Sequence, residues 1–316
     1  MEVIKLLETI RTPFLDTFFS LITKLGEEDI FIIISLFVFW CINKKIGFYL
    51  LFVGFAGTLI NQFLKITFKV PRPWIKDPTF TIVESVKDSA SGFSFPSGHT
   101  QTSVGVYGGL AKAFKSKILR IICISLCLLI PLSRLYLGVH TFEDVIISVL
   151  LAITFVFVFY PFIDKNFNNK KKMNYLMITM FILCLAHLLY VQFSPSNKLI
   201  EISLYENAMK NAYKLIGCSA GVILALILDR KYIKFNTKAV WWAQILKLVL
   251  GIIPILIIKS VLKQPLIDLC GNLYIANAIR YFLILFFACG IWPLTFKYFS
   301  KTKRERHQTA VPYILT

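Results

Sequence analysis

Acidic residues are scarce in this chain of 316 residues, which has 17 Asp and Glu side chains against 35 Lys and Arg. No group of them is spaced to hold Mg²⁺, an ion that takes its ligands from carboxylates and other oxygens. The seven cysteines lie mostly within apolar stretches, with neither metal-ligand spacing nor the pattern of a disulfide framework. The sequence therefore indicates neither a metal centre nor a disulfide-stapled domain.

Charged residues of both signs make up only 16% of the chain, whereas 57% of the residues are hydrophobic and the mean hydropathy is +0.69. A soluble domain of this length cannot bury so much apolar surface, and several apolar runs approach the length that crosses a bilayer. We predict an all-α, polytopic helical membrane protein. We expect no cleavable signal peptide, because charged residues interrupt the N-terminal apolar positions.

The predicted organisation has four parts. Residues 1–25 alternate apolar and charged positions at helical spacing, which indicates one or two amphipathic helices at the membrane interface, with a short first span as the alternative. A core follows at 26–165, then additional transmembrane helices at 174–299 and a basic cytoplasmic tail at 300–316. The apolar runs predict about nine spans, at about 28–43, 47–68, 99–115, 118–136, 141–163, 174–192, 207–229, 239–262 and 274–298.

The net charge of +18 would suggest a nucleic-acid partner in a soluble protein. Here the basic residues instead occupy every second loop, at Lys44-Lys45, Lys112 to Arg120, Lys165 to Lys172, Arg230 to Lys238 and Lys297 to Arg306. Cytoplasmic loops carry such an excess of Lys and Arg, so we expect no nucleic acid and a cytoplasmic C-terminus. The short loops favour a bacterial plasma membrane.

Two pairs of glycines have the spacing of close helix packing in membranes. They are Gly105 with Gly109 and Gly217 with Gly221. We expect each pair to pack a helix within the chain rather than between two copies.

The first of three polar clusters ends the second predicted span. Lys65 and Arg72 are seven residues apart, about two helical turns, so both can face the same way. Pro71 and Pro73 are expected to end the helix around Arg72. The alternative is two cations that merely reach the membrane surface from a helix end.

The second cluster is Pro-Ser-Gly-His, which precedes a run compatible with a helix. Ser97 is expected to be the N-cap, and Gly98 lets the backbone approach a ligand closely. The free amides of the first turn would then point at an anion, and His99 can protonate a leaving oxygen. The alternative is a simple capped helix with a chance histidine.

The third cluster runs from Arg134 through His140 to Asp144. The last two are four residues apart and share a face if both are helical. The carboxylate can then accept a proton from one imidazole nitrogen and leave the other as a nucleophile. A bend at Gly138 would bring the Arg134 guanidinium to the same phosphate. The alternative is a His–Asp pair that stabilises a helix start. By the alternation of basic loops, all three clusters are expected on the extracytoplasmic side.

The clusters read, in order, Lys-x6-Arg-Pro, Pro-Ser-Gly-His and Ser-Arg-x5-His-x3-Asp. Their order and spacing resemble the type-2 phosphatidic acid phosphatase superfamily over roughly residues 12–165, with all three signature motifs unsubstituted. The predicted spans place the resemblance with the membrane lipid-phosphatase branch.

That resemblance implies a role for each residue. His140 would attack phosphorus and form a phosphohistidine, Asp144 would orient His140, and His99 would protonate the leaving oxygen and then help activate water. Five residues would cradle the phosphate: Lys65, Arg72, Ser97, Gly98 and Arg134. The family type implies no metal and no cofactor.

The expected function is hydrolysis of a lipid phosphate monoester or a diphosphate, such as phosphatidic acid, phosphatidylglycerol phosphate or a polyprenyl diphosphate. Transfer of the phosphoryl group to another acceptor is one alternative, since water and an alcohol would use the same residues. A glucose-6-phosphatase-like enzyme with a soluble substrate is another, given the extra C-terminal spans. A transporter or assembly scaffold on an inactive core is the reading from a different class, and the intact His140, Asp144 and His99 argue against it.

Overall fold

A computed structural model describes residues 1–87, 90, 92–194 and 199–299 of the chain, which omits the predicted tail at 300–316. The described residues form helices and connections, with no strand among them, so the predicted all-α fold is confirmed. The α-helices are α1 (Glu2–Thr9), α2 (Pro13–Lys24), α3 (Glu28–Phe37), α4 (Lys44–Phe68), α5 (Pro73–Lys76), α6 (Gly98–Ala113), α7 (Lys117–Tyr136), α8 (Phe142–Asn166), α9 (Lys170–Gln192), α10 (Leu199–Leu228), α11 (Trp241–Ser260), α12 (Lys263–Cys270) and α13 (Leu273–Phe286).

Short π and 3₁₀ segments join or extend these helices. The π segments are η1 (Val38–Ile42), η3 (Asp229–Ile233) and η4 (Phe287–Ile291), and the 3₁₀ segments are η2 (Glu84–Val86) and η5 (Trp292–Tyr298). Each π segment prolongs the preceding α-helix, so that η1 continues α3, η3 continues α10 and η4 continues α13.

Seven helices in the described part of the chain are long and apolar enough to cross a membrane. They are Lys44–Lys76, Lys117–Tyr136, Phe142–Asn166, Lys170–Gln192, Leu204–Ile233, Trp241–Ser260 and Leu273–Tyr298. The predicted count of nine is not confirmed, because α3 has 10 residues and α6 has 16. Both lie among other helices: α6 packs against α4, α7 and α8, so its surface need not be apolar all round. The chain is an integral membrane protein.

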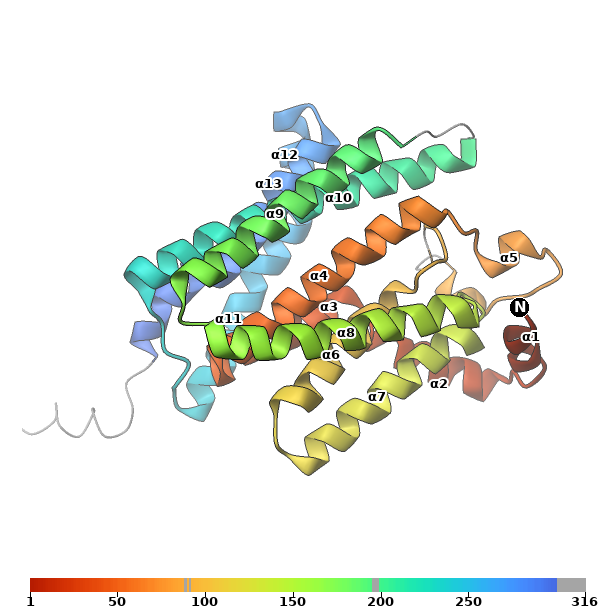
Figure 1. Cartoon of the computed structure of the whole chain (residues 1–316), viewed down its shortest axis with the longest axis horizontal. Coiled ribbons are helices and arrows are strands. Elements are labelled where there is room, and N and C mark those ends of the chain that lie inside the picture. Colours follow the sequence, from red (N-terminus) through yellow and green to blue (C-terminus); the bar gives the residue numbers. More distant parts are fainter. Residues whose placement is uncertain (88–89, 91, 195–198, 300–316) are drawn as a thin grey trace, which may run out of the picture.

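The first layer of the fold is built around α4 and α6. Figure 1 shows α4 crossing the middle of the molecule, with α6, α7 and α8 below it. A glycine at position 109 makes the contact between α4 and α6 close, since a Cβ there would lie 2.7 Å from Leu50 Cδ2. The predicted packing of this glycine pair within the chain is therefore confirmed at Gly109.

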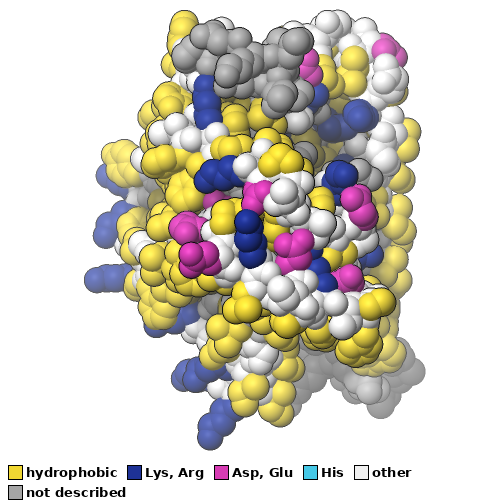
Figure 2. All heavy atoms as spheres, turned by 90° about the vertical axis from the view of Figure 1, so that its right-hand side faces the viewer, with side chains coloured by type: hydrophobic (Ala, Val, Ile, Leu, Met, Phe, Trp, Pro, Cys, Tyr) yellow, Lys and Arg dark blue, Asp and Glu magenta, His cyan; other side chains and the backbone are white. Residues whose placement is uncertain are grey.

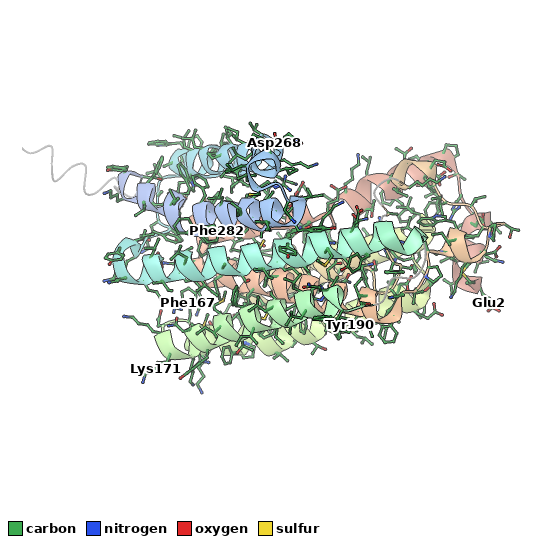
Figure 3. The ribbon with its side chains drawn as sticks, turned by 90° about the horizontal axis from the view of Figure 1, so that it is seen from above. Glu2, Phe167, Lys171, Tyr190, Asp268 and Phe282 are labelled. Atoms are coloured by element: carbon green, nitrogen blue, oxygen red, sulfur yellow. The ribbon has the colours of Figure 1, made fainter. Side chains whose placement is uncertain are left out.

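The second layer is the C-terminal extension of α9 to α13, which lies over the first in the view from above (Figure 3). Its centre is the pair α10 and α13, where a Cβ at Gly217 would lie 2.0 Å from the carbonyl oxygen of Ala278. The extension joins the core through a buried indole, because Trp40 Nε1 donates a 2.8 Å hydrogen bond to the Ala288 carbonyl. One hydrophobic cluster runs through both layers.

Connections alternate between two ends of the molecule. In Figure 1 the α6–α7 and α8–α9 connections and the chain after α10 lie toward the left, whereas the α4–α5 and α7–α8 connections and the C-terminal end of α9 lie toward the right. The right-hand end carries charged side chains of both signs within apolar flanks (Figure 2). One of its ion pairs joins Lys5 Nζ to Asp77 Oδ2 at 2.6 Å and holds α1 to the chain after α5. The first two helices also expose large apolar side chains, among them Leu6, Phe14 and Leu21.

The close contact of α10 with α13 gives a stability prediction. Gly217→Ala places a methyl group against backbone, so the two helices must separate, and we expect a loss of about 1–3 kcal/mol of unfolding free energy. Gly108→Ala is the matched control, since its Cβ would meet Val156 Cγ2 at an ordinary 3.7 Å. Both variants gain the same helix propensity. Thermal unfolding in detergent should show a lower Tm for the first variant only, and equal Tm values would contradict the packing described.

Candidate active site

The end of α4 supplies the first part of the site. The helix stops at Phe68 because Lys69 adopts a left-handed conformation with φ of 47°, and the residue before Pro71 is restricted to extended backbone. The prediction that the helix ends around Arg72 is therefore wrong. Arg72 lies beyond α4 as the N-cap of α5, and the chain turns it back toward Lys65.

Both cations bind backbone carbonyls of the loop that follows. Lys65 Nζ donates to the carbonyl of Phe93, and Arg72 Nε donates to the carbonyl of Gly92 at 3.1 Å. The Arg72 side chain is only 5% exposed. The part of the predicted 70–96 loop around Gly92 and Phe93 therefore contributes to one wall of the site.

The N-terminus of α6 supplies the second part. Ser97 is the N-cap, as predicted, and its Oγ accepts a 3.4 Å hydrogen bond from the Thr100 amide. Asn61, one turn before Lys65 on α4, donates from Nδ2 to the Pro96 carbonyl at 3.4 Å and fixes this turn against α4. A Cβ at Gly98 would lie 3.9 Å from Asn61 Oδ1, so open space remains beside the first amides of α6.

The loop between α7 and α8 supplies the third part. The predicted bend is present at Gly138, where φ is +78°. Arg11, which follows α1, holds the start of this bend, because its Nε donates to the Tyr136 carbonyl at 3.1 Å. The sequence suggested that His140 and Asp144 share a helix, but in the structure they do not. His140 precedes the N-cap Thr141, and α8 begins at Phe142.

Asp144 reaches back to His140 through a capping box. Its Oδ2 accepts hydrogen bonds from the Thr141 amide at 2.8 Å and from Ser94 Oγ at 2.5 Å. The same Oδ2 lies 3.5 Å from Nδ1 of His140. A hydroxyl, an amide and an imidazole thus converge on one oxygen of a carboxylate that is 1% exposed, and this fixes the carboxylate beside the ring.

The contact of His140 with Arg72 determines its tautomer. Nε2 of His140 lies 3.0 Å from Nη1 of Arg72, which also donates to the Val139 carbonyl at 2.8 Å. A guanidinium has only donors, so Nε2 must accept and the imidazole proton must be on Nδ1, facing Asp144. The ring is therefore arranged as a neutral imidazole whose Nε2 lone pair points toward cations.

Arg134 brings a third cation to the site from α7. It is 1% exposed, and its Nη1 donates to Thr23 Oγ1 on α2 at 2.7 Å. Its buried Nε has no hydrogen-bond partner among the described residues. A buried donor without an acceptor is costly, so this nitrogen is suited to an anionic oxygen in the site.

A polar cavity of about 260 Å³ opens beside the N-terminus of α6. Gly98 and His99 line it, together with Asn61, Gln101 and Glu28. Both amide atoms of Gln101 are buried without a partner in the described part of the chain, which fits a cavity that holds polar groups. His99 is thereby placed on the wall of a space that a polar molecule can occupy.

The structure brings the three predicted clusters to one end of the core. Arg72 of the first cluster contacts Val139 and His140, and the Ser97 amide of the second donates to the Asp144 carbonyl of the third at 3.2 Å. Three contributors were absent from the sequence prediction: Ser94, Asn61 and Arg11. Asn61 had a usable signal, since a polar residue in an apolar run one turn before Lys65 is a functional hint. The other two act through contacts with residues 50 and 125 positions away, for which the sequence carries no local signal.

Comparison with known families agrees with this geometry. A family model described as the PAP2 superfamily matches residues 46–168, which contain all the predicted site residues. A second model, described as the transmembrane extension of PAP2 superfamily phosphatases, matches residues 213–304. The chain belongs to the PAP2 superfamily. The first match thus spans α4 to α8, and the second begins within α10 and includes α11 to α13 of the C-terminal extension.

Curated relatives of this PAP2 chain are membrane lipid phosphatases by name. Sphingosine-1-phosphate phosphatase 1 of Rattus norvegicus is 25% identical over 276 residues, which is 80% of this chain and 60% of that protein. Undecaprenyl-diphosphatase BcrC of Bacillus subtilis is 29% identical over 122 residues, 39% of this chain and 60% of that protein. Phosphatidylglycerophosphatase B of the same organism is 29% identical over 169 residues, 49% of this chain and 79% of that protein.

The chain spans about 60% of the length of the rat protein, so about two fifths of that relative lie outside the match. No solved structure gave a significant match. Among the described residues of this PAP2 chain, no three His, Cys, Asp or Glu side chains gather where a metal ion would need them.

The charge around His140 predicts its titration. Burial lowers the pKa of His140 well below its ordinary 6.5, and the positive charges of Arg72, Arg134 and Lys65 and the nearby His99 lower it further. His140 therefore stays neutral in the folded protein where an unfolded chain would take up a proton. The folded state consequently loses stability as pH falls below about 6.5.

NMR of ¹³C-histidine-labelled protein in detergent tests this directly. The chain has four histidines, and His140→Gln assigns the signal. We expect the His140 signal to remain that of neutral imidazole at pH 6.5 and to titrate only at lower pH. A midpoint at or above 6.5 would contradict the described environment.

Proposed function

We propose that this protein is an integral membrane phosphatase that hydrolyses lipid phosphate monoesters or diphosphates on the extracytoplasmic side. The observation that carries the proposal is the position of His140, whose Nε2 lies 3.0 Å from Nη1 of the buried Arg72 while its Nδ1 lies 3.5 Å from Asp144 Oδ2. A nucleophile next to preorganised positive charge is what transfer of a phosphoryl group requires.

The first step forms a phosphohistidine. Nε2 of His140 donates its lone pair to phosphorus as the bond from phosphorus to the leaving oxygen breaks. The negative charge of the bound phosphate favours the protonated form of His99, which gives its proton to that oxygen, and Asp144 stabilises the positive charge that develops on the imidazole of His140. In the second step His99 takes a proton from water, the water oxygen attacks phosphorus, and the electron pair of the P–N bond returns to Nε2.

Five groups are proposed to hold the equatorial oxygens: the cations of Lys65, Arg72 and Arg134, the hydroxyl of Ser97 and the amide of Gly98. The unpartnered Nε of Arg134 supports this role, because phosphate oxygen would satisfy it. The free amides at the start of α6 add the positive end of a helix.

Three observations support a lipid substrate and the extracytoplasmic side. The three relatives named above act, by their names, on sphingosine 1-phosphate, undecaprenyl diphosphate and phosphatidylglycerophosphate. The site lies at the end opposite the α6–α7 and α8–α9 connections, which carry Lys112 to Arg120 and Lys165 to Lys172. The exposed apolar side chains of α1 and α2 at the site's end suit an interfacial position, where a headgroup can enter while its tails stay in the bilayer.

Phosphate release by purified protein tests the function. The panel comprises sphingosine 1-phosphate, phosphatidic acid, phosphatidylglycerol phosphate, undecaprenyl diphosphate and glucose 6-phosphate, each without and with EDTA. We expect release from at least one lipid by wild type and a loss of about 10³-fold or more in His140→Ala, because the nucleophile is gone.

His187→Ala is the matched control, since His187 is buried in α9 outside the site and should leave the rate near wild type. Equal rates for wild type and His140→Ala would contradict the assigned nucleophile. Loss of wild-type activity on adding EDTA would contradict a metal-independent reaction. If the phosphoryl group were transferred to an added alcohol in place of water, the protein would be a phosphotransferase.

A further inference from the structure

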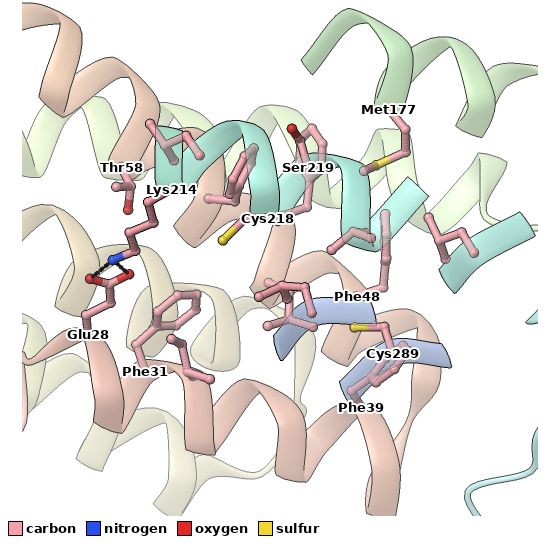
Figure 4. Close-up of a pocket in the computed structure, with 18 residues that line it drawn as sticks. Glu28, Phe31, Phe39, Phe48, Thr58, Met177, Lys214, Cys218, Ser219 and Cys289 are labelled. Atoms are coloured by element: carbon pink, nitrogen blue, oxygen red, sulfur yellow. Dashed lines mark hydrogen bonds and ion pairs between the residues drawn. The ribbon is translucent and has the colours of Figure 1, made fainter. Parts of the chain in front are cut away.

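An apolar pocket lies between the PAP2 core and the extension. Its walls come from α3, η1, α4, α9, α10, α13 and η4, and its cavity volume is about 80 Å³. Figure 4 shows Phe31, Phe48 and Cys218 among the side chains around it. Most of the lining is aliphatic or aromatic, so the pocket is a narrow apolar space.

The pocket adjoins the polar cavity beside His99. Two residues, Glu28 and Thr58, line both spaces. The lining changes character at these residues: on one side lie His99, Asn61 and Gln101, and on the other lie phenylalanines and leucines. The structure therefore places a polar compartment at the active site directly next to an apolar compartment under the extension.

An ion pair marks the boundary between the two compartments. Lys214 Nζ on α10 lies 2.5 and 2.6 Å from the two carboxylate oxygens of Glu28 on α3, as Figure 4 shows. The pair contains the only charged side chains in the pocket lining, and it connects the core to the extension. A molecule that fits both compartments must therefore be polar at one end and apolar beyond Glu28.

We propose that this pocket binds one hydrocarbon chain of the substrate whose phosphate lies at His140, and that the extension serves to form it. The proposal rests on the proposed function. A chain that leaves the bilayer for the pocket exchanges one apolar environment for another, so little is gained from water exclusion. The pocket instead positions the lipid and selects its chain by length and shape, which are interactions that a phosphate site alone cannot provide.

Filling the pocket tests the proposal kinetically. Cys218→Phe places a phenyl ring in the space, and Cys270→Phe on α12 makes the same change away from it. The readout is kcat/KM for hexadecyl phosphate divided by kcat/KM for hexyl phosphate, in identical micelles so that partitioning cancels between enzymes. We expect Cys218→Phe to lower this ratio at least tenfold and Cys270→Phe to keep it. If Cys218→Phe is folded and its ratio of the two kcat/KM values equals that of the wild type, the proposal is overturned.

Photolabelling tests the same proposal without a pocket substitution or turnover. The probe is a hexadecyl phosphonate with a diazirine near the end of its chain, applied to the full-length wild-type protein. We expect labels on peptides of α3, α4 or α10 that line the pocket, and several-fold weaker labelling by the matching uncharged alcohol. Labels elsewhere, or equal labelling by the alcohol, would overturn the proposal, because the pocket would then hold only bilayer hydrocarbon.

The two experiments distinguish failure of the proposed function from failure of the pocket proposal. If no phosphate ester is hydrolysed, the proposed function fails, and the phosphonate labelling still supports or overturns a pocket for phosphate-bearing lipids. If phosphate is released but the ratio and the labelling pattern both fail, the pocket proposal alone is overturned.

Discussion

Three cations and one carboxylate set the electrostatics of the site, and all of them are buried except the half-buried Lys65. Lys65, Arg72 and Arg134 approach His140 from different segments, and Asp144 is the carboxylate that faces them. Gathering like charges in a protein interior costs free energy unless each finds acceptors. The carbonyls of Gly92, Phe93 and Val139 supply some of these acceptors. The excess of positive charge remains, and it is the property that suits the site to a phosphate.

The surrounding fold keeps this arrangement in place. Asp144 is held by Ser94 and Thr141, so its carboxylate can hold the His140 proton on Nδ1. Arg11 holds the turn that carries His140, and Asn61 holds the turn that begins α6. These positions come from helix ends and loops anchored on the rigid packing of α4 with α6, as in other sites where loops carry chemistry on a fixed scaffold. The extension adds a second wall against α4, and with it the apolar pocket.

Sequence alone predicted the all-α fold and several local features of the backbone, because these have local signals. The N-cap at Ser97 follows from residue type and position, and the bend at Gly138 follows from a residue that tolerates positive φ. The errors lie where a local signal is lacking or misleading. Lys69 ends α4 in a left-handed conformation that lysine seldom adopts, so the helix was expected to continue to the prolines. His140 was placed on a helix because its spacing from Asp144 fits one, whereas a capping box gives the same proximity from the preceding loop.

The central claim is that phosphorus is transferred to Nε2 of His140. The most direct measurement is to mix the protein with ³²P-labelled lipid phosphate, quench within one turnover at alkaline pH, and map the label by peptide mass spectrometry. We predict phosphate on the peptide that contains His140 in the wild type and none on that peptide in His140→Gln. Label on His99 or another residue, or wild-type turnover with no labelled peptide at any quench time, would contradict it.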